Sequence, residues 1–68
     1  MKLWIARDES NDLNLYHLKP KLKKSIGDMS FWQPQKFGIE YPICSKLFPE
    51  VTFENSPQMI EVSLIKEK

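Results

Sequence analysis

The sequence predicts a small, mainly β protein, either a single antiparallel sheet or an open barrel, with at most one short helical turn near residues 45–48. Two runs at residues 2–8 and 12–19 alternate as strands do and are joined by a short polar link, so the chain should begin with a β-hairpin. Five prolines divide the chain into pieces too short for a long helix. No window has a sustained helical period. A chain of 68 residues is expected to form one small domain, residues 1–68.

The register of this hairpin follows from the side-chain period, because a slip of one residue moves every apolar group to the opposite face. A three-residue loop at 9–11 places Asn11 where the turn needs a positive φ, which asparagine tolerates. A four-residue loop would scatter the apolar groups over both faces. The expected pairs are Asp8–Asp12, Ala6–Asn14, Ile5–Leu15, Trp4–Tyr16 and Leu3–His17, with Leu3, Ile5, Leu13 and Leu15 on one face.

The middle of the chain is expected to add two short strands. Pro20 ends the second strand, since proline lacks an N–H and restricts the residue before it. Residues 25–28 have the composition of a turn, and residues 29–32 follow as a short strand. Apolar and polar residues alternate in 36–41, which predicts a third or fourth strand before the next proline.

The last third of the chain has room for at most one short helical turn and is expected to hold one further strand. Residues 45–48 are long enough for a single turn, with Ser45 as its cap and Pro49 as its stop. Residues 51–54 are brief and extended, and a turn follows at 55–57. The alternation of 59–66 predicts a final strand with Ile60, Val62 and Leu64 inward and Glu61 and Ser63 outward.

Composition argues against a disulfide or metal staple. Cys44 is the only cysteine, so no internal disulfide can form, and His17 is the only histidine, which falls short of the four ligands of a structural zinc site. The first apolar run is broken by charged residues at 7–9, so it lacks the core of a secretory signal. No apolar stretch approaches the ~20 residues that span a bilayer. With the unpaired thiol, these features favour a cytoplasmic protein without a membrane partner.

Neither His17 nor Cys44 indicates that the protein is an enzyme. His17 is expected on the second strand, and no spacing places a carboxylate beside it to make a general base. Cys44 has one nearby cation, Lys46, which is weak evidence for an activated thiol. Phosphate-binding loops, nucleophile elbows and metal-binding helices do not occur in the sequence. We therefore expect no catalytic residues, no cofactor and no metal site.

A lysine cluster indicates nucleic-acid binding as an alternative function. Positive charge beside exposed aromatic rings holds single-stranded nucleic acids on small β platforms, and an aromatic pair at 31–32 follows the cluster closely. The formal net charge of +1 and the single arginine lack the basic excess of most nucleic-acid binders. Four of the ten basic residues form the candidate nucleic-acid patch, namely Lys19, Lys21, Lys23 and Lys24.

Association with a second copy or another protein is the favoured function. No basic residue occurs in 47–65, so the lysine cluster and this acidic stretch could complement each other between copies. A small sheet also has edges that invite another chain. Phe31 and Trp32 are the expected aromatic anchors of such an interface. The sequence thus predicts a non-enzymatic binding or accessory module that acts as a homo-oligomer or with a protein partner.

The chain opens with LWIARDES and DLNLYHLKP, has FW at its centre, and closes with LFPEVTFENSP and IEVSL. In these segments it resembles a family of short, uncharacterised bacterial and phage-type proteins with an LWIARD-like first strand and an FPEVTFE-like final segment. The resemblance covers nearly the whole chain and implies a complete small protein carried on a mobile element. It implies no activity and no site residues. This sequence departs from the family at residues 10–12, where the family often has an aspartate-glycine turn.

Overall fold

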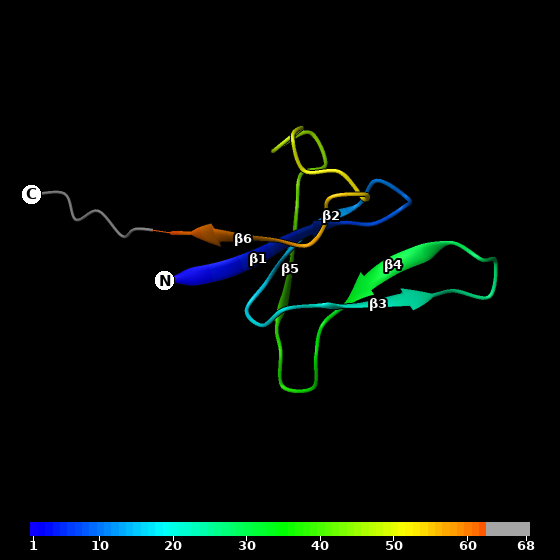
Figure 1. Cartoon of the computed structure of the whole chain (residues 1–68), viewed down its shortest axis with the longest axis horizontal. Helices are drawn as coiled ribbons and strands as arrows, with labels where there is room; N and C mark the ends of the chain where they lie inside the picture. Colours follow the sequence, from blue (N-terminus) through cyan, green and yellow to red (C-terminus); the bar gives the residue numbers. More distant parts are fainter. Residues whose placement is uncertain (63–68) are drawn as a thin grey trace, which may run out of the picture.

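The computed structural model describes residues 1–62, and these form six strands and no helix. Four strands make one antiparallel sheet in the order β5-β2-β1-β6, and β3 pairs with β4 in a second sheet (Figure 1). The mainly β class is therefore confirmed, although the strands divide between two sheets and neither closes into a barrel. No helix in this part of the chain could cross a membrane. The strands are β1 (Lys2–Arg7), β2 (Leu13–Tyr16), β3 (Lys21–Lys24), β4 (Ser30–Gln33), β5 (Glu40–Ile43) and β6 (Gln58–Glu61).

The β1–β2 hairpin has the predicted loop and register. The Asp8 N–H donates to the Asp12 carbonyl over 2.8 Å, and the Asn11 N–H donates to the Asp8 carbonyl over 2.9 Å. Asn11 has a φ of 84°, the left-handed conformation that this loop requires. The observed pairs include three that the alternation predicted, namely Trp4–Tyr16, Ile5–Leu15 and Ala6–Asn14.

The second strand is shorter than the alternation predicted. β2 ends at Tyr16 instead of continuing to residue 19, and the chain bends at residues 17–18 toward the second sheet. The expected pair of Leu3 with His17 is therefore not part of the β1–β2 register. The His17 N–H instead donates to the Ile39 carbonyl over 3.1 Å, which continues the pairing of β2 with β5.

The β3–β4 hairpin repeats the loop of the first one. The Ser25 N–H donates to the Met29 carbonyl over 2.9 Å, and the Asp28 N–H donates to the Ser25 carbonyl over 3.1 Å. Asp28, in the place equivalent to Asn11, also has a positive φ, of 64°. The predicted turn and the strand after it are confirmed, but the strand at 21–24 was missed because three lysines interrupt any apolar alternation. Residues 21–33 are called the arm below, since they project from the four-stranded sheet (Figure 1).

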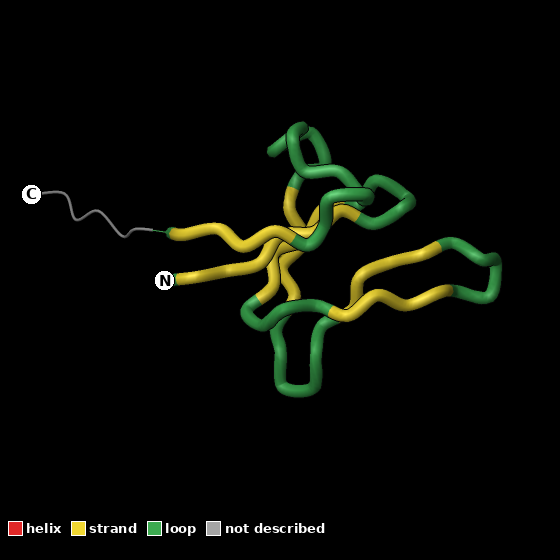
Figure 2. The backbone as a smooth tube through the Cα atoms, viewed as in Figure 1, coloured by secondary structure: helices red, strands yellow, loops and turns green. Residues whose placement is uncertain are grey.

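The core lies on one face of the four-stranded sheet. Ile5, Leu13 and Val51 are its buried centre, with exposures of 0%, 1% and 3%. Val51 comes from the long connection between β5 and β6, which contains no strand (Figure 2) and folds over this face. The register places four side chains on one face, as predicted, namely Leu3, Ile5, Leu13 and Leu15. The residues that pack around the buried centre are Leu15, Ile43 and Ile60.

The opposite face of the sheet is also covered, because the base of the arm docks against it. Tyr16 is fully buried, and its hydroxyl donates to the Trp32 carbonyl over 3.1 Å. Two carboxylates that follow β1 accept main-chain N–H groups of β4: Asp8 accepts from Trp32 and Glu9 accepts from Ser30, both over 2.7 Å. Polar contacts therefore hold the two sheets together.

Two predicted elements in the middle of the chain are corrected by the structure. Residues 36–41 do not form one strand, because a turn intervenes in which the Gly38 N–H donates to the Gln35 carbonyl over 2.7 Å, and β5 begins only at Glu40. The segment near 45–48 is a hydrogen-bonded turn and not a helical one, closed by the Leu47 N–H and the Cys44 carbonyl over 3.0 Å.

The C-terminal predictions are met in part. Residues 51–54 are not a strand, since side-chain bonds between Thr52 and Asn55 make a turn there. The final strand exists as β6 with Ile60 toward the core, as predicted. Residues 63–66 of that predicted strand, with Ser63 and Leu64, lie outside the described part of the chain.

Candidate functional site

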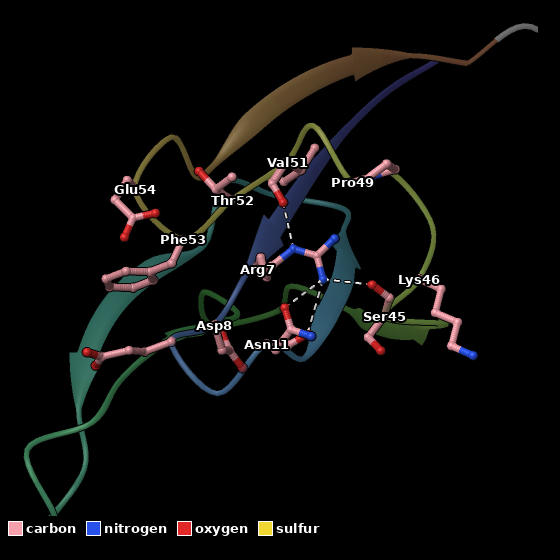
Figure 3. A pocket seen from close by; sticks show the side chains of 11 residues that line it. Arg7, Asp8, Asn11, Ser45, Lys46, Pro49, Val51, Thr52, Phe53 and Glu54 are labelled. Atoms are coloured by element: carbon pink, nitrogen blue, oxygen red, sulfur yellow. Dashed lines mark hydrogen bonds between the residues drawn. The ribbon is translucent and has the colours of Figure 1, made fainter.

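Arg7 occupies the centre of a dense polar site at the end of β1 (Figure 3). Its side chain is buried, with 7% exposure. Nε donates to the Val51 carbonyl over 2.6 Å, and Nη1 donates to the Ser45 carbonyl over 2.8 Å. The remaining acceptors are the carbonyls of Leu47 at 3.0 Å and Phe48 at 3.1 Å, and the carbonyl and side-chain oxygens of Asn11, both at 3.2 Å.

These bonds give Arg7 a structural role. Its acceptors are neutral oxygens, and most belong to the connection between β5 and β6 that covers the core. A guanidinium has five donors in a fixed fork, and all three of its nitrogens are engaged inside the protein. Arg7 is thus not free to bind a ligand. The sequence held one signal of this role, since Arg7 comes two residues after Ile5 and so continues the core face of β1.

An open hollow of about 640 Å³ lies beside Arg7 (Figure 3). Carboxylates of Asp8, Glu9 and Glu54 and the ammonium group of Lys46 stand around it. Within residues 1–62 no group of histidine, cysteine and acidic side chains could hold a metal ion. The hollow is lined by Arg7, Asp8, Glu9, Asn11, Ser45, Lys46, Pro49, Val51, Thr52, Phe53 and Glu54.

A smaller depression beside it gathers Asp8, Asp12 and Glu40. Burial raises the pKa of the Asp8 carboxyl, the bond from the Trp32 N–H opposes that rise, and the charge of Asp12 adds to it. Burial also raises the pKa of Glu40, to which the charge of Asp8 contributes. For the Tyr16 hydroxyl, burial is again the largest cause of a raised pKa. The raised pKa values of these three groups therefore follow mainly from burial.

The structure separates the four lysines of the predicted patch. Lys21 and Lys23 lie on one face of β3, on which Lys23 pairs with Phe31 of β4. Lys24 lies on the opposite face of the same strand. Lys19 precedes the strand and holds its ammonium group 5.4 Å from the centre of the Trp4 ring.

Among residues 1–62, no carboxylate forms an ion pair with these lysines. All four are exposed. The sole ion pair within residues 1–62 joins the Met1 amino group to Glu61 over 3.3 Å. Within the described part of the chain, the arm and the segment before it thus present exposed positive charge without an ion-pair partner.

Phe37 is the functional candidate that the sequence reasoning missed. Its side chain is 87% exposed and its φ is 69°, a conformation that is unfavourable for a bulky residue. The ammonium group of Lys36 lies 5.4 Å from the centre of its ring. The Gln35 side chain donates to the Lys19 carbonyl over 2.6 Å, which places this loop beside the lysine-rich segment. The missed signal was a phenylalanine directly before Gly38 in a turn.

The predicted aromatic anchors belong to the arm. Trp32 packs against Phe53, with ring centroids 6.5 Å apart, and both of its main-chain groups bond to the four-stranded sheet. Its indole Nε1 is buried without a hydrogen-bond partner among residues 1–62. Phe31 is partly buried on the other face of β4. Trp32 therefore serves largely to dock the arm, whereas Phe31 borders the exposed lysines.

The strand edges differ in how far they are protected. The outer main-chain groups of β4 are bonded by Asp8, Glu9 and Tyr16. β5 has Pro42 at a position that faces away from β2 and so offers no N–H there. The side chains of β3 are mostly lysines, which discourage edge pairing.

The edge of β6 lacks these protections. The Met1 and Val62 main chains exchange two hydrogen bonds, at 2.7 and 3.0 Å, so their pair is of the hydrogen-bonded type. Because the two types of pair alternate along an antiparallel ladder, the N–H and C=O groups of Met59 and Glu61 point away from β1. Nothing within residues 1–62 pairs with them.

His17 and Cys44 both lie on the surface of the protein. His17 is exposed and borders an apolar groove of about 430 Å³ with Leu3, Ile39 and Tyr41. Cys44 is exposed in the turn after β5.

Comparison with known proteins adds no relative, because no protein-family model, no curated protein and no solved structure matches the chain. The resemblance to phage-type proteins stays a prediction. The geometry of the site must therefore carry the functional argument.

Proposed function

We propose that the protein is a non-enzymatic binding module that associates with a second copy of itself through the edge of β6. The observation that carries this proposal is the contrast among the four strand edges. Proteins usually blunt their sheet edges with proline, lysine or covering segments, and β5, β3 and β4 each use one of these devices. An edge with open main-chain groups is the element that strand addition uses.

The chemistry of β6 suits a second copy of the same strand. In an antiparallel pair centred on Ile60, Met59 of one copy would lie opposite Glu61 of the other. Both residues direct their main-chain groups outward, so each pair could form two hydrogen bonds. Pairs centred on Glu61 would set two like charges opposite each other, which is unfavourable. The self-complementary register is therefore the one centred on Ile60, and it joins two four-stranded sheets into one.

The test is the mass of the protein in solution, measured by light scattering over a range of concentrations. We expect a mass of two chains that falls toward one chain on dilution. Met59→Pro removes only an N–H that points away from β1, so it should abolish association while the β1–β6 pairs remain. Met59→Ala is the matched control, because it shortens the side chain and keeps the N–H.

Hydrogen exchange keeps the test decisive if the proline variant fails to fold. In the unaltered protein, the amides of Met59 and Glu61 should exchange more slowly at high than at low protein concentration. A single-chain mass at every concentration, or exchange of these amides that ignores concentration, would overturn the proposal. Slow exchange that appears only with a different protein would also count against pairing between copies.

A further inference from the structure

We propose that the protein also binds single-stranded nucleic acid on a lysine–aromatic surface, made by the Phe31 face of the arm and the 34–38 loop. The lysine–aromatic surface comprises Lys19, Lys21, Lys23, Lys36, Phe31 and Phe37.

The positive charge of this surface is available to a ligand. Lys21 and Lys23 stand on the same face of β3, and Phe31 of β4 lies directly across the hairpin from Lys23. The bond from the Gln35 side chain to the Lys19 carbonyl places the 34–38 loop, which carries Lys36, beside the segment that carries Lys19. Phosphate groups of a polynucleotide are the chemistry that such a group of separate, exposed ammonium groups attracts.

The aromatic rings favour a polynucleotide over an acidic protein. Phe37 is 87% exposed and is held at a φ of 69°, so the loop spends backbone strain to present an apolar ring to water. The ring is too exposed to belong to the core, and the Lys36 ammonium group lies 5.4 Å from its centre. Unpaired bases stack on such rings whatever their sequence, whereas an acidic peptide has no flat partner to offer. A duplex keeps its bases stacked inside, so a single strand is the better ligand.

Fluorescence anisotropy of a labelled, mixed-sequence DNA oligonucleotide tests this proposal. We expect binding that weakens steeply as salt rises, through release of counterions. Lys21→Gln together with Lys23→Gln should lower the affinity about tenfold or more at low salt and reduce the salt dependence. Phe37→Ala should lower the affinity by about tenfold with the salt dependence unchanged, because it removes stacking and no charge. Lys46→Gln is the matched control, since Lys46 is an exposed lysine beside the acidic hollow.

Circular dichroism of each variant would confirm that the fold is retained, and Phe37→Ala is expected to keep it because the ring is exposed. No binding by the unaltered protein at low salt would overturn the proposal. An affinity for a duplex or for polyglutamate equal to that for the single strand would also overturn it. So would a Phe37→Ala variant that binds the single strand as tightly as the unaltered protein does. These measurements do not depend on association through β6, which is tested separately by solution mass and by hydrogen exchange at Met59 and Glu61.

Discussion

The two hairpins of this protein share one loop design and have opposite surroundings. Each has a three-residue loop closed by the same pair of main-chain hydrogen bonds, with a residue of positive φ at its end, Asn11 in one and Asp28 in the other. The β1–β2 hairpin is buried on both faces, whereas every residue of β3 is exposed. The local turn chemistry thus makes a hairpin, and the side chains of the strands decide whether it becomes core or arm.

The difference extends to how each hairpin is held. The first hairpin supports the core through apolar packing and through Arg7, which binds the connection that covers it. The arm is held at its base by hydrogen bonds with Asp8, Glu9 and Tyr16 and by the packing of Trp32 against Phe53. We therefore expect damage to the first hairpin to unfold the protein, and damage to the base of the arm to cost less.

Arg7→Met should have the largest effect. The substitution keeps an unbranched apolar side chain and removes the guanidinium donors from the carbonyls of Val51, Ser45 and Leu47, while the Phe48 carbonyl keeps its bond from the Val51 N–H. The free energy of unfolding should fall by ~3–5 kcal/mol, because the buried Val51 carbonyl and the partly buried carbonyls of Ser45 and Leu47 lose their donor together. Urea unfolding followed by circular dichroism measures it. Lys46→Met serves as the control, and a loss of the same size there would remove the special role of Arg7.

Asp8→Ala should undock the arm at a smaller cost. It leaves the Trp32 N–H without its acceptor, for which we expect a loss of ~1–3 kcal/mol in the free energy of unfolding. Asp8→Asn keeps an oxygen for that N–H and removes the charge, so it is the matched comparison. In a Trp4→Phe background, the fluorescence of Trp32 would report directly whether the arm is docked. Equal behaviour of the two variants would show that the bond to the arm does not matter.

The difference in stability between Asp8→Asn and the unaltered protein should depend on pH. Because the folded state raises the pKa of Asp8 above its ordinary value of 3.8, the folded protein binds this proton more tightly than the unfolded chain. The ionised carboxylate therefore opposes folding above its folded pKa, and this penalty disappears as the pH falls toward 3.8. Asp8→Asn should gain most over the unaltered protein at neutral pH and least in acid. A gain that grows in acid would contradict the raised pKa.

Asp28→Gly should have the smallest effect and the opposite sign. Glycine adopts a positive φ without the steric cost of a side chain, so the variant should be more stable by about 0.5 kcal/mol. Asn11→Gly should show no such gain, because the Asn11 side-chain oxygen accepts a bond from Arg7 over 3.2 Å. Thermal unfolding of both variants compares the two loops. Equal gains would mean that the loops are equivalent in context as well as in geometry.

Sequence reasoning succeeded where alternation was strong and failed where polar residues form strands. The first hairpin was predicted with its loop and three of its observed pairs, because leucine, isoleucine and tryptophan alternate there. β3 was missed because its lysines carry no apolar period, although the turn after it was recognised. Phe37 escaped notice since it was assigned to a strand that begins only at Glu40.

The sequence by itself determined the β class, the first hairpin and the turn that makes the second, because these depend on side-chain period and on residues that accept a positive φ. Only the tertiary structure decided how the second hairpin docks on the four-stranded sheet, since that docking uses contacts from Asp8, Glu9 and Tyr16 to β4, 16 to 24 residues further along the chain. It also decided the role of Arg7, which depends on carbonyls some forty residues away. Long-range polar contacts leave no period in a sequence, because each needs only one side chain and any main-chain partner that the fold brings near.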